Sequence, residues 1–159
     1  MQDILDILEQ DALATPEKIS LMTKLPVEEV RRRVRQLEDD KIIVGYKTII
    51  DDDKAERQSV KALIEVKITP ERDGGFNRLA ARIAKYDEVK TCYLMSGGYD
   101  LLVIVEGSDL KQVATFVSEK LATISGVLST ATHFMLKAYK EQGTLFTQEQ
   151  FEERLKVSP

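Results

Sequence analysis

The chain is poor in the residues from which disulfide frameworks and metal sites are built. Its 159 residues include one cysteine, Cys92, and one histidine, His133. A single cysteine excludes an intramolecular disulfide framework and favours a reducing compartment, the cytoplasm. One cysteine and one histidine are too few for a zinc cluster with the usual nitrogen and sulfur ligands. We therefore expect neither a bound metal nor another cofactor.

A long apolar run is also missing. Every uninterrupted apolar stretch is far shorter than the roughly 18 residues that a membrane-spanning helix requires. The first residues carry Asp3 and Asp6 where a secretory signal has basic residues and an apolar block, so no such signal is expected. With 43% hydrophobic residues the chain still has enough apolar side chains for a folded core.

The sequence has no excess of positive charge. Its formal net charge is −4, and residues 1–60 hold 10 Lys and Arg against 14 Asp and Glu. Residues 61–159 hold 13 of each sign. A DNA-binding function therefore depends on a local basic surface, because the bulk charge does not supply one.

The first fifty residues predict three short helices and a β-ribbon. Apolar residues at helical spacing indicate a helix over residues 2–11. Thr15, followed by a proline, is typical of the N-cap of a second helix. A third helix opens near Pro26 and carries an apolar stripe formed by Val27, Val30, Val34 and Leu37. Because residues 42–50 are β-prone, the order predicts a winged helix-turn-helix over residues 1–50.

The predicted third helix carries four arginines within five positions. When its apolar stripe faces inward, Arg32 and Arg35 face outward and the other two lie on the flanks. The guanidinium fork suits both phosphates and guanine edges. We therefore predict a DNA-binding surface formed by Thr23, Lys24, Glu28, Arg31, Arg32, Arg35 and Gln36. The alternative is that Glu28 and Arg32 form an ordinary surface pair and the other arginines are only solvated.

Residues 51–58 are polar, lack apolar periodicity and are predicted to link two domains. The elements expected after this linker run in the order β-α-β-β-α-β, with strands at residues 59–69, 89–95, 101–106 and 127–139 and a second helix N-capped by Asp109. The predicted fold class is therefore α+β, with a ferredoxin-like domain over residues 59–140. Both helices would cover one face of a four-stranded antiparallel sheet.

The other face of that sheet would be uncovered. Strand residues such as Phe134 and Leu136 would then expose a larger apolar patch than a monomer tolerates. We expect a homodimer built sheet against sheet, which would also present two recognition helices to two half-sites. The tail, residues 141–159, could be a docking helix or a frayed end.

Three groups of residues together carry a family resemblance. They are Val30-Arg31-Arg32-Arg33-Val34-Arg35-Gln36-Leu37-Glu38 with Ile43-Val44-Gly45-Tyr46, then Gly98-Tyr99-Asp100-Leu101, then Gly126-Val127 with Thr130, Thr132, Phe134 and Leu136. In this order and spacing the chain resembles the leucine-responsive/asparagine-regulator (Lrp/AsnC) family of bacterial and archaeal transcription factors. The resemblance covers nearly all of residues 2–142.

The resemblance implies dimers built through the C-terminal domain, often assembled into tetramers or octamers. It also implies a small effector, usually an amino acid, bound between dimers near the hairpin turn. Carried over by position, the effector site would involve Gly97, Gly98, Tyr99, Asp100, Thr130 and Thr132. Glycines let a ligand approach backbone N–H groups, and Asp100 can accept from an α-ammonium group. The alternative is that the glycines only form the turn and Asp100 caps it.

Two positions depart from the family pattern. The family usually has a serine where this chain has Pro26, at the start of the recognition helix. It usually has a glycine where this chain has Lys41, and a left-handed helix cap there would strain a lysine.

The predicted function is a sequence-specific, DNA-binding transcriptional regulator whose assembly or DNA binding is modulated by an amino-acid effector. It would act in the cytoplasm as a homo-oligomer on double-stranded, palindromic operator DNA, with no membrane partner and no enzymatic activity. One alternative is a tetrapyrrole-type decarboxylase of the same fold, for which His133 is the only histidine. The other is an amino-acid-binding regulatory module without DNA affinity, which the acidity of residues 1–60 would favour.

Overall fold

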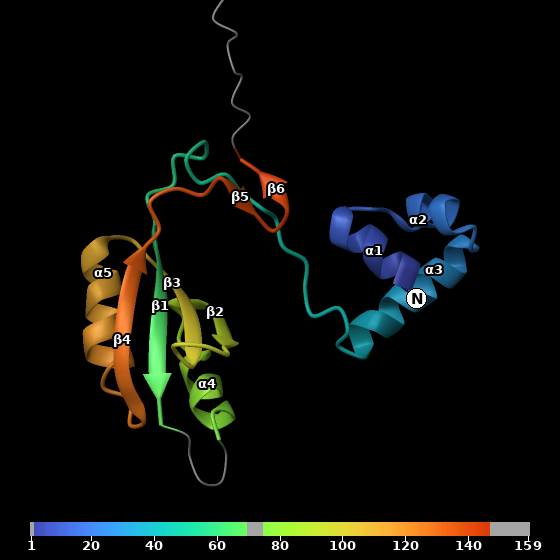
Figure 1. The fold of residues 1–159 in the computed structure, drawn as a ribbon. Helices are drawn as coiled ribbons and strands as arrows, with labels where there is room; N and C mark the ends of the chain where they lie inside the picture. The colour runs from blue at the N-terminus through green and yellow to red at the C-terminus, as the bar shows by residue number, and fades with distance from the viewer. Residues whose placement is uncertain (1, 70–74, 147–159) are drawn as a thin grey trace, which may run out of the picture. The chain divides into compact units, whose positions relative to one another are not determined.

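The computed structural model describes residues 2–69 and 75–146. The chain divides into two compact units, Met1–Ile49 and Ile50–Pro159, whose elements are labelled in Figure 1. Each unit has its own hydrophobic core. Among the described residues, no helix is long and apolar enough to cross a membrane.

The N-terminal unit consists of three helices around a small core. Ile4, Ile19, Val30 and Leu37 are its buried residues. The hydroxyl of Thr15 accepts a hydrogen bond from the Lys18 amide at 3.2 Å, so the predicted N-cap is confirmed. The helices are α1 (Gln2–Gln10), α2 (Pro16–Thr23) and α3 (Val27–Asp39).

Helix α2 buries less than its sequence indicates. Two large apolar side chains of this helix, Leu21 and Met22, are both exposed, Leu21 by 83%. The helix has only eight residues, and its inward row consists of Ile19 and, one turn later, the half-buried Thr23. A helix of two turns therefore contributes a single large side chain to the core.

The β-ribbon predicted for residues 42–50 is wrong: all of these residues are described, and none of them lies in a strand. A tight hairpin requires a positive φ at its turn, and Gly45 does not adopt one. The amides of Ile42 and Ile43 instead both donate to the Leu37 carbonyl, at 2.9 and 3.0 Å. Lys41 takes the left-handed conformation with φ 57° to make this turn. The segment then leaves the helix extended and without a strand partner.

The C-terminal unit combines helices with an antiparallel sheet, as predicted. Its four main strands are ordered β2-β3-β1-β4, with β1 and β3 in the centre (Figure 1). Ile64 of β1 pairs with Val103 of β3 and with Thr132 of β4. The elements are β1 (Val60–Ile68), α4 (Asn77–Ile83), β2 (Val89–Leu94), β3 (Leu101–Gly107), α5 (Leu110–Thr115), the π-helical η1 (Phe116–Leu121) and β4 (Val127–Phe134).

Alternation along the central strands separates the two faces of the sheet. One face packs against α4, α5 and η1 and supplies most of the core, formed by Ala62, Ile64, Val66, Ile68, Leu101, Val103, Val105, Leu79, Ile83, Val113, Phe116, Leu121 and Ile124. On the opposite face Leu63, Leu102 and Ile104 are only half-buried and Tyr93 is exposed. The helices therefore cover one face and leave an apolar strip on the other.

The helix predicted after Asp109 changes its winding halfway. The Asp109 carboxylate accepts from the Gln112 amide at 2.8 Å, which confirms the cap. From Phe116 the chain becomes π-helical, and Phe116 and Leu121, five residues apart, are both buried. Leu110, directly after the cap, is exposed. The side chains that this segment buries thus follow the wider π-helical spacing after Phe116.

Residues 51–57 form a tight turn that packs against β1. The Arg57 amide donates to the Asp52 carbonyl at 3.0 Å, and Glu56 is left-handed with φ 53°, as at the end of a helix. Lys61 Nζ lies 2.6 Å from the Asp52 carboxylate, and this ion pair links the turn to β1. The segment expected as an open linker is thus grouped with the C-terminal unit.

The last long strand is shorter than predicted. It ends at Phe134, after which the Met135 amide still donates to the Lys61 carbonyl at 2.9 Å. Because Phe134 pairs with the buried Ala62, it lies on the face that the helices cover, so the prediction that it lies on the uncovered face is wrong. Leu136, which is 96% exposed, lies beyond the end of the strand. A short hairpin follows, formed by β5 (Lys140–Glu141) and β6 (Thr144–Leu145). Residues 147–159 of the predicted tail lie outside the described residues.

The strained cap of α3 gives a first test. We expect Lys41→Gly to stabilise the protein by about 0.5–1 kcal/mol, because relief of the left-handed strain exceeds the greater entropy of glycine in the unfolded chain. Urea unfolding followed by circular dichroism measures the change. Lys47→Gly is the control, since Lys47 is exposed and does not have a positive φ. If the two variants change stability equally, the strain at Lys41 is not real.

Candidate nucleic-acid interface and ligand-binding corner

The outer face of α3 is polar and forms a shallow hollow. Its inward residues, Val30 and Leu37, are fully buried, so the rotation of the helix is the one that the apolar stripe predicts. Arg32, Arg35 and Gln36 are exposed on the outer side. The hollow is lined by Glu28, Arg31, Arg32, Arg35, Gln36, Asp39 and Asp40.

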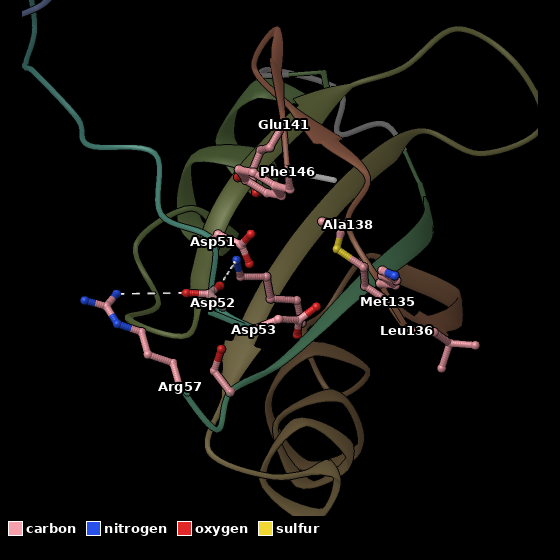
Figure 2. A pocket seen from close by; sticks show the side chains of 12 residues that line it. Asp51, Asp52, Asp53, Arg57, Met135, Leu136, Ala138, Glu141 and Phe146 are labelled. Carbon is pink, nitrogen blue, oxygen red and sulfur yellow. Dashed lines mark hydrogen bonds and ion pairs between the residues drawn. The ribbon is translucent and has the colours of Figure 1, made fainter. Parts of the chain in front are cut away.

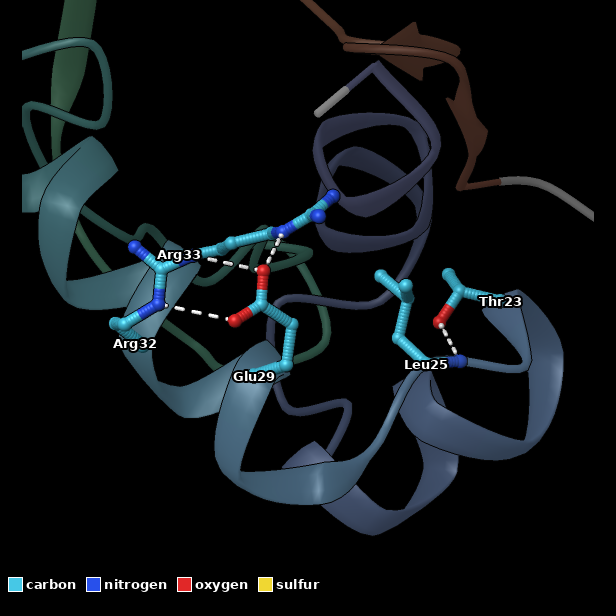
Figure 3. Close-up of polar contacts among 5 residues, drawn as sticks. All are labelled: Thr23, Leu25, Glu29, Arg32 and Arg33. Carbon is cyan, nitrogen blue, oxygen red and sulfur yellow. Dashed lines mark hydrogen bonds and ion pairs between the residues drawn. The ribbon is translucent and has the colours of Figure 1, made fainter.

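Glu29 holds two of the four arginines (Figure 3). Its carboxylate accepts from Nε and Nη2 of Arg32 at 2.9 and 2.8 Å, and from Nε of Arg33 at 2.6 Å. Hydrogen bonds from Arg32 and then Arg33 lower the pKa of Glu29 to about 2. The carboxylate is therefore ionised throughout the neutral range, and it neutralises part of the positive charge of the helix.

Arg31 is held between two helices. One of its Nη atoms donates to the carboxylate of Glu17 on α2, and its Nε lies 3.6 Å from Glu28. Exposed ion pairs of this kind contribute about 0–1 kcal/mol each. Their main effect here is to fix where the guanidinium group lies, between α2 and α3.

Arg35 differs from the other three arginines. Within the described part of the chain its side chain makes no ion pair or hydrogen bond, and neither does the side chain of Gln36. Both side chains are exposed. The pair that we considered as an alternative, Glu28 with Arg32, is not formed, because Arg32 turns to Glu29 one residue closer. Sequence reasoning missed Glu29, although its spacing of three and four to the arginines was a usable signal.

The two predicted contacts before α3 shape the turn between the helices. The Thr23 hydroxyl donates to the Ile19 carbonyl at 2.8 Å. It also accepts from the Leu25 amide at 3.4 Å, as Figure 3 shows. Lys24 is left-handed, with φ 60°, and its side chain is exposed. The Thr23 hydroxyl is thus already engaged within the protein, whereas Lys24 is accessible to a ligand. A role in DNA binding stays a prediction for both.

Asp100 joins the hairpin turn to the central strand. Its Oδ2 accepts from the Ile68 amide at 2.8 Å, and its own amide donates to the Val66 carbonyl at 3.0 Å. The pairing of β1 with β3 ends at Val66 and Leu101, so the Asp100 carboxylate supplies the acceptor that β3 no longer offers to the Ile68 amide. Asp100 therefore has a structural role, but its carboxylate binds β1 and not the turn that it was expected to cap; among the described residues no hydrogen bond to the other oxygen, Oδ1, is formed.

The remaining residues of the predicted effector site are only partly brought together. Thr130 pairs with Val66, the same residue that Asp100 contacts, so both lie at one end of β1. Thr132 lies two residues farther from the turn. An added Cβ at Gly97 or Gly98 would meet no atom within 4 Å, and only Gly97 has a positive φ, of 150°. Packing therefore does not require these glycines, and Tyr99 is half-buried.

A second hollow, of about 90 Å³, lies between the tight turn at residues 51–57 and the chain after β4 (Figure 2). Asp52 binds Lys61 at its edge and lies 4.0 Å from Arg57. Sequence reasoning did not find this hollow, because it joins segments far apart in the chain. Among the described residues no group of three or more possible ligands is placed to hold a metal ion. The hollow is lined by Asp51, Asp52, Asp53, Arg57, Ser59, Lys61, Met135, Leu136, Lys137, Ala138, Glu141 and Phe146.

His133 lies on the face of the sheet that the helices do not cover. Its Nε2 is 3.5 Å from Oε1 of Glu65 on the neighbouring strand, and its side chain is exposed. A cross-strand pair of this kind accounts for the residue structurally. The decarboxylase alternative gains no support from it.

Comparison with known proteins identifies relatives over almost the whole chain. A family model described as the Lrp/AsnC ligand binding domain matches residues 61–145. The chain is 44% identical to YugG, an HTH-type transcriptional regulator of Bacillus subtilis, over 158 residues, or 99% of this chain and 95% of the relative. It is 31% identical to an HTH-type transcriptional regulator of Pyrococcus horikoshii over 138 residues, or 87% and 88% of the two chains.

A solved structure gives the same result. The chain resembles a transcriptional regulator from Neisseria meningitidis that was crystallised with L-methionine, with a TM-score of 0.69 and 27% sequence identity. The match covers 87% of this chain and 89% of the other.

Proposed function

The chain belongs to the Lrp/AsnC family of transcriptional regulators, and on this basis we propose that α3 binds double-stranded DNA and that a small effector, an amino acid, modulates its assembly or its DNA binding. The relatives are named as regulators and not as enzymes, which argues against the decarboxylase alternative. In this proposal α2 and α3 form a helix-turn-helix, followed by the extended segment at residues 42–50 in place of a ribbon. The sheet and its helices form a ferredoxin-like domain for effector binding and dimerisation.

The observation that carries the DNA-binding proposal is the free outer face of α3. Arg35 and Gln36 are exposed and, among the described residues, uncommitted, and Arg32 and Arg31 lie beside them. Arginine donates two parallel hydrogen bonds to a guanine edge or to a phosphate, whereas glutamine donates one to N7 of adenine and accepts one from its N6 amino group. Because residues 1–60 are acidic overall, this face has to supply most of the attraction for DNA.

In this proposal a second copy of the chain covers the exposed face of the sheet. The uncovered face of the sheet carries Leu63, Leu102 and Ile104, with Tyr93 exposed beside them. Pairing two such faces would remove the apolar strip from water and place two copies of α3 on two half-sites of a palindromic operator. Assembly into tetramers or octamers, as the family resemblance implies, and action in the cytoplasm, where the DNA is, belong to the same proposal.

The effector would bind at the corner formed by the hairpin turn and the end of β1. Oδ1 of Asp100 is available to accept from an α-ammonium group, because the Ile68 amide uses Oδ2. Gly97 and Gly98 leave their backbone groups accessible. Thr130 lies near the turn, and Thr132 would be reached only by a longer ligand or one bound across a second dimer. The Neisseria relative was crystallised with L-methionine, which makes amino acids the first ligands to test.

DNA binding is tested by Arg35→Ala. We expect the affinity for DNA from the region upstream of its own gene to fall by about 1–3 kcal/mol if Arg35 reads a base. If it contacts a phosphate, the slope of log K against log salt should become shallower by about one. Fluorescence anisotropy over a salt series measures both.

Arg82→Ala, which removes an exposed arginine from α4, is the matched control and should bind DNA as the wild type does. An Arg35 variant with wild-type affinity and slope would overturn the assignment of α3 as the DNA-binding helix.

Effector binding is tested by thermal shift against the twenty amino acids. A specific ligand at a hundredfold excess over its dissociation constant should stabilise the protein by about 2.7 kcal/mol. Asp100→Asn keeps an acceptor for the Ile68 amide but removes the charge, so it should fold normally and lose the ligand shift. Asp100→Ala should lose stability as well. A ligand shift that survives Asp100→Asn would place the ammonium group elsewhere.

A further inference from the structure

One acidic side chain, Glu29, holds the guanidinium groups of two arginines of α3, Arg32 on the outer side and Arg33 on the flank. Glu29 binds Arg32 through two donors and Arg33 through a third, at 2.6–2.9 Å. Its side chain is only 26% exposed, whereas that of Arg32 is 65% exposed. The carboxylate is therefore less accessible than Arg32, while Arg33, at 31%, is about as buried as Glu29 itself.

We propose that Glu29 is a specificity-determining residue, which holds Arg32 and Arg33 away from the phosphates of DNA of arbitrary sequence and so lowers non-specific binding. The proposal rests on the proposed DNA-binding function of α3. In this proposal Arg35 and Gln36 make the first contact with DNA. Arg32 contacts DNA only at a sequence whose groups bind its guanidinium more strongly than Glu29 does.

The geometry of the Arg32 contact supports this role. Arg32 offers Nε and Nη2, one complete edge of its fork, to Glu29. This is the edge-on arrangement with which arginine also grips a phosphate, so the two partners compete for the same donors. A phosphate that binds Arg32 must either displace the carboxylate or accept weaker, single hydrogen bonds.

Charge counting gives the consequence for binding. Non-specific affinity comes from neutralised phosphates, and each one steepens the dependence of log K on log salt by about 0.9. Glu29 reduces the two positive charges of Arg32 and Arg33 to a net charge of one. A specific sequence can offset this loss through base contacts, whereas a random sequence cannot. Glu29 thus weakens the complexes with random DNA more than the complex with the operator.

The arrangement does not act as a pH switch. The pKa of Glu29 is lowered to about 2 by its arginine partners. The carboxylate therefore stays ionised at every pH at which the protein would meet DNA, and the effect is constant.

Glu29→Gln tests the proposal in the full-length protein. The amide keeps the size of the side chain and can still accept one hydrogen bond, but it no longer neutralises the arginines. We expect affinity for a random DNA duplex to rise about fivefold to tenfold and its salt slope to steepen by about one. Affinity for the operator fragment should rise less, so the ratio of specific to non-specific affinity falls.

A control separates this effect from charge alone. Glu9→Gln removes the same charge from an exposed position of α1, outside the proposed DNA-binding surface. It should change the specificity ratio less than Glu29→Gln does. Thermal melting of both variants checks that the N-terminal unit stays folded.

The outcomes distinguish this proposal from the one on which it rests. If the wild type binds DNA through Arg35 but Glu29→Gln leaves the ratio unchanged, or changes it no more than Glu9→Gln, the role of Glu29 is wrong and the function stands. If the wild type shows no salt-dependent DNA binding, the proposed function itself fails. A Glu29 variant that raises operator and random affinity equally would also overturn the specificity role.

Discussion

The burial of one apolar stripe determines what α3 can do. Val30 and Leu37 are fully buried against α1 and α2, and each such burial is worth about 1.5–3 kcal/mol. The exposed ion pairs around the arginines contribute about 0–1 kcal/mol each. Packing therefore decides which way the helix is rotated, and the ion pairs only arrange the arginine groups on the side that packing leaves free. The DNA-binding proposal depends on that rotation.

The features that the sequence predicted correctly are those that depend on local spacing, and the features that it missed depend on partners elsewhere in the chain or on side-chain rotamers. The caps at Thr15 and Asp109, the rotation of α3 and the order of strands and helices were all accessible, because each rests on local spacing or on alternation over many residues. The ribbon at residues 42–50 was wrong because strand pairing depends on a partner that local composition cannot supply. The pairing of Arg32 with Glu29 was missed because spacings of three and four are nearly equivalent on a helix, and rotamers decide between them.

The candidate ligand corner shows a similar limit. The glycines and Asp100 were visible in the sequence, but the hydrogen bond from the Ile68 amide was not, since it depends on where the pairing of β1 with β3 ends. Asp100 therefore serves the fold with one oxygen and is available to a ligand with the other. A ligand at this corner would act on α3 through the assembly of protomers, and the uncovered face of the sheet is the surface on which such an assembly would form.

The central claim is that the outer face of α3 meets DNA with Arg35 free and Arg32 held by Glu29. Titration of ¹⁵N-labelled protein with a random DNA duplex, observed at the arginine Nε–Hε resonances, tests it most directly. The account predicts that the Arg35 resonance shifts from the first additions while those of Arg32 and Arg33 stay near their free positions. Shifts of Arg32 as large as those of Arg35, or no shift at any arginine of α3, would contradict it.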